Sequence, residues 1–222
     1  MRHATRNSEV SSVWPAGLGR ALARRVLLAG LAAAFGLEPL PGCAHDIGLV
    51  KPPIEVPDVT VVSADGVSAP LSDLLRGRVT AIQLMFSKCK SICPIEAATL
   101  ARVQEALEAV RDNSTDNIQL LSLSIDPATD TPEVLKAWLE RFGAQRGWTA
   151  AAPAEADLGR VRAFFDRASA LGEDHSTVIS LVDRNGRLVW RSLELPPPDE
   201  VARLLVQLQR AGAASPQTPG QQ

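Results

Sequence analysis

The segment that decides the fold runs from residue 79 to residue 94 and reads Val79-Thr80-Ala81-Ile82-Gln83-Leu84-Met85-Phe86-Ser87-Lys88-Cys89-Lys90-Ser91-Ile92-Cys93-Pro94. Its first eight residues are mostly apolar, which is typical of a buried strand. Pro94 follows the second cysteine, and proline is favoured in the first turn of a helix. Apolar residues then recur at helical spacing through Leu100, Val103, Leu107 and Val110. This pattern predicts a strand, a loop that holds Cys89, and a helix whose first turn holds Cys93.

Two thiols near a helix N-terminus form a reactive pair, because the helix dipole and the free N–H groups favour the thiolate. Thiolates carry out disulfide exchange and bind soft metals. Lys88 and Lys90 flank Cys89, in a chain with only four lysines, and we expect their charge to lower the pKa of this thiol. A purely structural disulfide is the less favoured alternative, because closing so short a loop adds little stability.

The N-terminal region has the pattern of an export signal. Three arginines (Arg20, Arg24 and Arg25) precede an apolar stretch over residues 26–37. Twelve residues fall short of the roughly 20 that span a bilayer, but they suit the apolar part of a signal peptide. We therefore expect an exported protein on the periplasmic side of the bacterial inner membrane.

The sequence Leu40-Pro41-Gly42-Cys43 after this stretch resembles a bacterial lipobox, in which the cysteine carries the lipid. On this interpretation Cys43 is the lipid anchor that tethers the chain to the membrane. Cleavage after Ala44 is the alternative, and it would remove Cys43 from the mature protein. In either case Cys89 and Cys93 remain as a pair in an oxidising compartment.

The remaining sequence predicts one domain between a linker and a tail. Residues 1–43 form the export segment, 44–57 a Pro-rich linker, 58–211 the domain and 212–222 a disordered tail. Strands are expected at 59–63, 79–86, 118–125, 177–182 and 188–191, and helices at 71–75, 95–110, 132–142, 155–170 and 199–208. This order, with reactive cysteines after the first long strand, predicts an α/β thioredoxin-like fold. We expect a central mixed sheet flanked by helices, with an N-terminal β extension.

Composition argues against nucleic acid as a partner. The net charge is −2, tyrosine is absent and aromatic residues make up only 4% of the chain. Beyond residue 43 the chain carries 18 basic and 23 acidic side chains. Such a domain has neither the basic surface nor the aromatic platform that nucleic acids require. Nothing in the sequence indicates more than a monomer.

His175 is the third residue of interest. His3 lies in the export segment and His45 at the start of the linker, so His175 is the single histidine of the expected domain. Thioredoxin-type reductases place a cis-proline in the loop before the corresponding strand, packed against the cysteines. Here that loop has no proline, and an imidazole there is able to reach both sulfurs. Two thiolates and one imidazole favour Cu(I), with Cu(II) or zinc as alternatives.

The chain resembles the Sco/SenC family over about residues 55–210. The resemblance rests on three motifs: Phe86 to Pro94, Ser124-Ile125-Asp126-Pro127 with Asp130-Thr131-Pro132-Glu133, and Asp174-His175-Ser176. It implies a membrane-tethered copper protein of thioredoxin fold that helps to assemble the CuA centre of cytochrome c oxidase. Cys89, Cys93 and His175 are then the copper ligands. Lys90 differs from the family, in which proline is common at this position, and it favours thiol exchange over metal entry.

Two functions follow from these expectations. The first is a copper metallochaperone whose partner is the CuA-bearing oxidase subunit or another periplasmic thiol or copper protein. The second is a thiol–disulfide reductase, in which Cys89 and Cys93 are the catalytic redox pair and His175 is dispensable. A thiol peroxidase fits less well, because Phe86 stands where such enzymes carry a threonine three residues before the reactive cysteine.

Overall fold

The structure is a computed structural model, and it describes residues 48–112, 115–165 and 177–214. These ranges contain a single mixed sheet of eight strands in the order β1-β8-β7-β4-β5-β6-β2-β3. The strands are β1 (Leu49–Glu55), β2 (Thr60–Ser63), β3 (Ser68–Pro70), β4 (Val79–Met85), β5 (Ile118–Ser124), β6 (Trp148–Pro153), β7 (Ile179–Val182) and β8 (Arg187–Arg191). The helices are α1 (Leu71–Leu75), α2 (Ile92–Ala109), α3 (Pro132–Arg141), α4 (Leu158–Phe165) and α5 (Pro198–Ala214).

The centre of the sheet is a parallel pair, β4 and β5, in which every residue is buried. Val79 pairs with Ile118 and the register continues without interruption to Met85 and Ser124. Parallel strands are covered on both faces, which explains why the sequences of β4 and β5 are mostly apolar. They also need a long crossover connection. Helix α2 is the crossover, so it begins beside the end of β4 that the cysteines follow.

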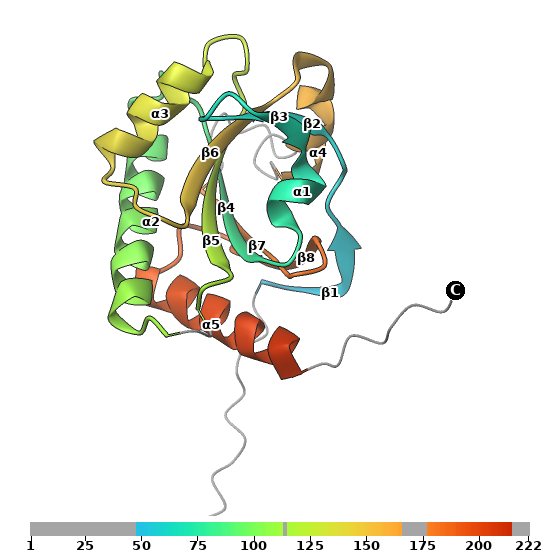
Figure 1. Cartoon of the computed structure of the whole chain (residues 1–222), viewed down its shortest axis with the longest axis vertical. Helices are drawn as coiled ribbons and strands as arrows, with labels where there is room; N and C mark the ends of the chain where they lie inside the picture. The colour runs from blue at the N-terminus through green and yellow to red at the C-terminus, as the bar shows by residue number, and fades with distance from the viewer. Residues whose placement is uncertain (1–47, 113–114, 166–176, 215–222) are drawn as a thin grey trace, which may run out of the picture. The chain divides into compact units, whose positions relative to one another are not determined.

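Helices cover both faces of the sheet, as Figure 1 shows. On one face α2 and α5 pack through residues such as Leu100, Val103, Val201 and Leu205. On the other face α1 and α4 pack through Leu71, Leu75, Val161 and Phe165. Successive residues of β4 alternate between these two clusters, as side chains of a strand must. The α/β thioredoxin-like architecture expected from the sequence is therefore confirmed.

The N-terminal part of the described chain adds strands to both edges. β1 lies inside the segment that composition predicts to be a linker, and it pairs antiparallel with β8. β2 forms a hairpin with β3 and also pairs with β6. The β extension is thus wider than the single strand that the sequence indicates.

Two further elements differ from the sequence-based expectation. β6 was not expected, because its three consecutive alanines at 150–152 carry little strand propensity; their burial between β5 and β2 holds them in the sheet. α5 extends to Ala214, beyond the expected end at 208 and into the expected tail. A 3₁₀ turn over Glu155–Asp157 precedes α4, which is described as far as Phe165. In the described part of the chain, no helix is both long and apolar enough to cross a membrane.

Candidate metal and redox site

The two cysteines lie where β4 ends and α2 begins. Cys89 is in the connecting loop and donates its N–H to the carbonyl oxygen of Phe86 at 3.1 Å. Cys93 is the second residue of α2. Its backbone N–H donates to the Sγ atom of Cys89 at 3.4 Å. The loop and helix placement expected from the sequence is confirmed, and one sulfur receives a hydrogen bond from the helix N-terminus.

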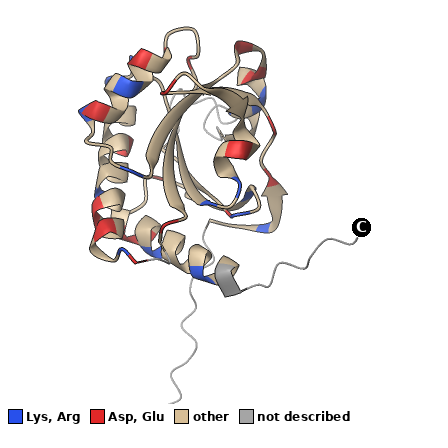
Figure 2. Cartoon of the chain, in the orientation of Figure 1, with Lys and Arg blue, Asp and Glu red and all other residues tan. Residues whose placement is uncertain are grey.

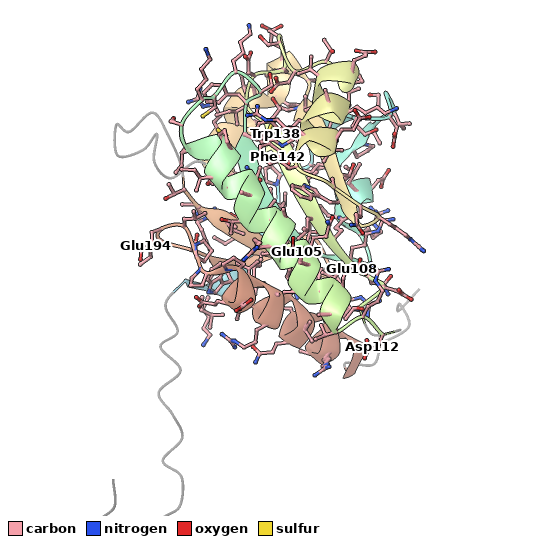
Figure 3. The ribbon with its side chains drawn as sticks, turned by 90° about the vertical axis from the view of Figure 1, so that its left-hand side faces the viewer. Glu105, Glu108, Asp112, Trp138, Phe142 and Glu194 are labelled. Carbon is pink, nitrogen blue, oxygen red and sulfur yellow. The ribbon has the colours of Figure 1, made fainter. Side chains whose placement is uncertain are left out.

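Both thiols are free and almost completely buried, each with 4% of its surface exposed. They belong to a hydrophobic cluster with Met85, Leu135 and Trp138. Figure 3 shows Trp138 and Phe142 beside the first half of α2, and their ring centroids lie 4.7 Å apart. Trp138 is buried in the core, and apolar side chains shield the sulfurs from water.

The two thiols have opposite pKa shifts. Burial opposes ionisation of Cys89, but hydrogen bonds from the side chain and backbone of Cys93 and from Ser91 outweigh it, so the pKa falls to about 7. Burial, and then the hydrogen bond with Cys89, raise the pKa of Cys93 to about 12. Near neutral pH a substantial fraction of Cys89 is therefore thiolate, whereas Cys93 keeps its proton.

The two lysines beside Cys89 are not the cause of its lowered pKa, which corrects the sequence-based attribution. Both are exposed, and the Nζ atom of Lys88 donates to the hydroxyl of Thr129 at 3.2 Å, toward the loop after β5. The hydrogen bonds that stabilise the thiolate come from Cys93 and Ser91 instead.

The carboxylate of Asp130 holds the loop that carries Cys89. Asp130 is 1% exposed and accepts the N–H of Ser87 on both oxygens, at 3.2 and 3.3 Å. It also accepts the hydroxyl of Ser124, at the end of β5, at 2.6 Å. The sequence alone does not indicate this role, because Ser87 lies 43 residues from Asp130. The helix that follows, α3, has Thr131 as its N-cap and begins at Pro132, as expected.

Asp126 is part of the turn after β5, as its position before Pro127 predicts. Its carbonyl oxygen accepts the N–H groups of Thr129 and Asp130, at 3.0 and 2.9 Å. The Asp126 N–H in turn donates to the Ser124 hydroxyl at 3.0 Å. This turn places Asp130 beside the end of β5, where its carboxylate accepts the N–H of Ser87.

Glu96 is an ionisable group near the cysteines that sequence analysis overlooked. It is fully buried, and in the described part of the structure neither carboxylate oxygen has a hydrogen-bond partner. Burial, and then the charge of Cys89, raise the pKa of Glu96 to about 9. The signal was present in the sequence, because Glu96 precedes Leu100 by four residues and therefore shares its buried helix face.

Two of the predicted site residues, Cys43 and His175, lie outside the described residues. Within the described ranges, no group of three or more histidine, cysteine and acidic side chains is arranged to hold a metal ion. The described part of the site therefore supplies two sulfur atoms. Two sulfurs, one of them partly ionised at neutral pH, are able to bind a soft metal or to exchange disulfides.

Residues 56–209 match the protein-family model described as SCO1/SenC. The chain belongs to the SCO1/SenC family. An SCO2-like protein of Rickettsia prowazekii is 30% identical over 126 residues, which cover 52% of this chain and 58% of the relative. The chain thus spans about three fifths of the length of that curated SCO relative.

Solved Sco structures share the fold. Yeast Sco1 with copper bound is 21% identical, with a TM-score of 0.58, and the match covers 74% of this chain and 96% of yeast Sco1. BsSco is described as a member of the Sco family of cytochrome c oxidase assembly proteins that has a disulfide switch. It is 20% identical with a TM-score of 0.59, and the match covers 71% of this chain and 95% of BsSco.

The opposite pKa shifts predict that the two thiols react at different pH. Alkylation of the reduced full-length chain with iodoacetamide should follow a thiolate midpoint near pH 7 at Cys89, because its pKa is lowered to about 7. Cys93 should stay unmodified up to pH 9, since its pKa is raised to about 12. Mass spectrometry of the two peptides measures both rates. Cys93→Ala, which removes the side-chain hydrogen bond, should move the Cys89 midpoint upward, and a wild-type midpoint near 9 would contradict the assignment.

Burial of Glu96 predicts a stability loss as pH rises. Between about pH 4.5 and 9 the folded chain keeps a proton that the unfolded chain releases, so the free energy of unfolding falls with pH. The loss is at most about 1.4 kcal/mol per pH unit. Glu96→Gln should therefore gain stability over wild type as pH rises, measured by urea unfolding of the reduced chain at pH 5, 7 and 8.5. Glu105→Gln, at a side chain 67% exposed, is the matched control; an equal pH dependence in both variants would refute the effect.

Proposed function

We propose that this SCO1/SenC chain is a copper metallochaperone that binds copper through Cys89, Cys93 and His175 and supports assembly of the CuA centre of cytochrome c oxidase. The observation that carries the proposal is the pair of adjoining, buried sulfurs at the start of α2. Soft thiolate ligands favour Cu(I) over the harder ions that carboxylates bind. A shielded, apolar surrounding slows oxidation of bound Cu(I) and of the free thiols alike.

The topology of the sheet supports His175 as the third ligand. β7 runs antiparallel to β4, and Ile179, its first residue, pairs with Gln83 near the end of β4. The chain that leads into β7 therefore enters the sheet at the end where β4 finishes and the cysteine loop begins. His175 precedes Ile179 by only four residues. So short a segment keeps His175 close to the end of the sheet that carries Cys89 and Cys93.

The high pKa of Cys93 makes copper binding a proton-linked step. A metal that takes both sulfurs must displace the proton of Cys93, whose pKa is about 12. At neutral pH Cys89 already supplies a thiolate, so it is the first sulfur to meet the incoming ion. Cys93 then closes the site, and release of copper to a partner reverses that step when Cys93 is reprotonated.

The export segment and Cys43 support a lipid-anchored location on the periplasmic side of the inner membrane. In that location the site faces other exported proteins, among them the CuA-bearing oxidase subunit. The family match and the description of BsSco as an oxidase assembly protein support that class of partner.

The different pKa values of the two thiols also favour a second candidate function, thiol–disulfide reduction. The Cys89 thiolate attacks a partner disulfide, forms a mixed disulfide and releases one partner thiolate, which takes up a proton. Cys93 then loses its proton and attacks the Cys89 sulfur, releasing the second partner thiol and leaving a Cys89–Cys93 disulfide. Two electrons pass from the chain to the partner. An attacking thiol with a pKa near ambient pH suits the first step.

Copper stoichiometry of the reduced, anaerobic full-length chain tests the proposal. Elemental analysis after gel filtration should find one copper ion per chain in wild type and none in Cys89→Ser or Cys93→Ser. His175→Ala should weaken copper binding by more than the roughly 10–100-fold that loss of an outer-shell partner costs. His45→Ala, at a histidine outside the expected domain, is the matched control and should bind like wild type.

A wild-type chain that stays copper-free under these conditions would overturn the metallochaperone role. If His175→Ala also reduces oxidised glutathione as fast as wild type while both serine variants fail, the chain is instead a reductase. Copper binding that survives in Cys93→Ser would contradict the two-sulfur site itself.

A further inference from the structure

A second concave site lies at the end of the sheet where β4, β5 and β6 begin. The segments that precede these parallel strands lie together, because Val79 pairs with Ile118 and Leu120 pairs with Trp148. A cavity of about 460 Å³ opens there. Sites of roughly 300–1,000 Å³ commonly hold small-molecule ligands.

This cleft is separate from the cysteines. Cys93 lies in the first turn of α2, whereas Arg111, which lines the cleft, lies two residues beyond the end of that helix. The 18 residues of α2 span about 27 Å at 1.5 Å per residue. Figure 3 shows the same separation, with Trp138 beside the first half of α2 and Asp112 at its far end. A ligand in the cleft therefore does not touch Cys89 or Cys93.

Three arginines from three different segments line the cleft: Arg78 before β4, Arg111 after α2 and Arg146 before β6. Figure 2 shows Lys and Arg (blue) and Asp and Glu (red) distributed over the helices and loops around the sheet. Asp65 and Asp116 also line the cavity, but within the described ranges no ion pair joins either of them to one of the three arginines. None of the three arginines is therefore paired with a carboxylate that lines the cleft.

A buried amide orients the guanidinium group of Arg78. Its Nη1 atom donates to Oε1 of Gln119 at 3.2 Å and to the carbonyl oxygen of Leu74 at 3.5 Å. Gln119 is 6% exposed and is fixed through Nε2, which donates to the Leu74 carbonyl at 2.7 Å and to the Thr80 hydroxyl at 2.9 Å. An arginine has five N–H donors, so Arg78 keeps its Nε and Nη2 donors for a ligand while its position is set in advance.

Arg146 and Arg111 differ in how much donor capacity they keep. Arg111 pairs with Glu108 through Nη2. Arg146, by contrast, makes no hydrogen bond or ion pair with another residue of the described chain and keeps all of its donors. The guanidinium fork matches the geometry of a carboxylate or a phosphate, which it binds through two parallel hydrogen bonds.

We propose that this cleft binds a small organic oxyanion, carrying phosphate or carboxylate groups, through Arg78 and Arg146. The cavity is larger than inorganic phosphate needs, so the ligand extends beyond its anionic group. Asp65 and Asp116 accept hydrogen bonds, and they suit a ligand whose remaining part carries hydroxyl or amino donors. Three guanidinium groups disfavour a metal ion. The site adds a ligand-binding function that is independent of copper.

Isothermal titration calorimetry of the full-length chain in mild detergent tests the cleft, with pyrophosphate and citrate as probes at constant ionic strength. At least one probe should bind saturably at one site, pyrophosphate alone indicating a phosphate ligand and citrate alone a carboxylate ligand. Arg146→Met should weaken binding about tenfold or more, as loss of a charge-assisted hydrogen bond does. Arg102→Met is the matched control, because that guanidinium is 72% exposed and lies outside the cleft.

Absence of saturable binding of both probes to wild type would overturn the proposal, as would equal weakening in Arg146→Met and Arg102→Met, which indicates bulk charge alone. Arg78→Met provides a second test, and its thermal unfolding midpoint verifies that the chain stays folded. Copper content measured on the same samples should be unchanged in Arg146→Met. Failure of the cleft is thereby distinguishable from failure of the copper site.

Discussion

The hydrogen bond from the Cys93 N–H to the Cys89 sulfur is the interaction on which the site depends. It places the charge of the Cys89 thiolate at the N-terminus of α2, where the helix dipole is favourable. At Cys89 this bond acts together with the hydrogen bonds from the Cys93 side chain and from Ser91 to outweigh burial, whereas at Cys93 burial prevails. One pKa therefore falls to about 7 and the other rises to about 12. Cys89 is therefore the thiol that reacts first, and Cys93 is the thiol that reacts second, after it loses its proton. This order suits both stepwise metal capture and disulfide exchange.

The surrounding fold keeps that hydrogen bond in place. The fully buried pair β4 and β5 fixes where the cysteine loop starts, and α2 fixes where it ends. Asp130 joins the cysteine loop to the sheet, because it accepts hydrogen bonds both from Ser87 in the loop and from Ser124 at the end of β5. Trp138 covers the sulfurs from α3. The site is thus assembled from three neighbouring segments at the end of the sheet where β4 and β5 finish, and not from the CxxxC segment alone.

The parts of this account that depend on local pattern could be predicted from the sequence. The apolar runs of β4 and β5, the helical period after Cys93 and the Thr131-Pro132 start of α3 were all predicted and confirmed. The parts that depend on long-range packing could not. β6 is held by its neighbours against the weak strand propensity of its alanines, and Asp130 finds Ser87 43 residues away in sequence. His175 stays a prediction, since it lies outside the described residues.

X-ray absorption at the copper K edge tests the central claim most directly. The full-length chain would be loaded anaerobically with one equivalent of Cu(I) and compared with His175→Ala treated in the same way. The account predicts two sulfur neighbours and one nitrogen neighbour in wild type, and loss of the nitrogen with both sulfurs retained in the variant. Identical spectra for the two chains, or copper with no sulfur neighbour, would contradict a site built from Cys89, Cys93 and His175.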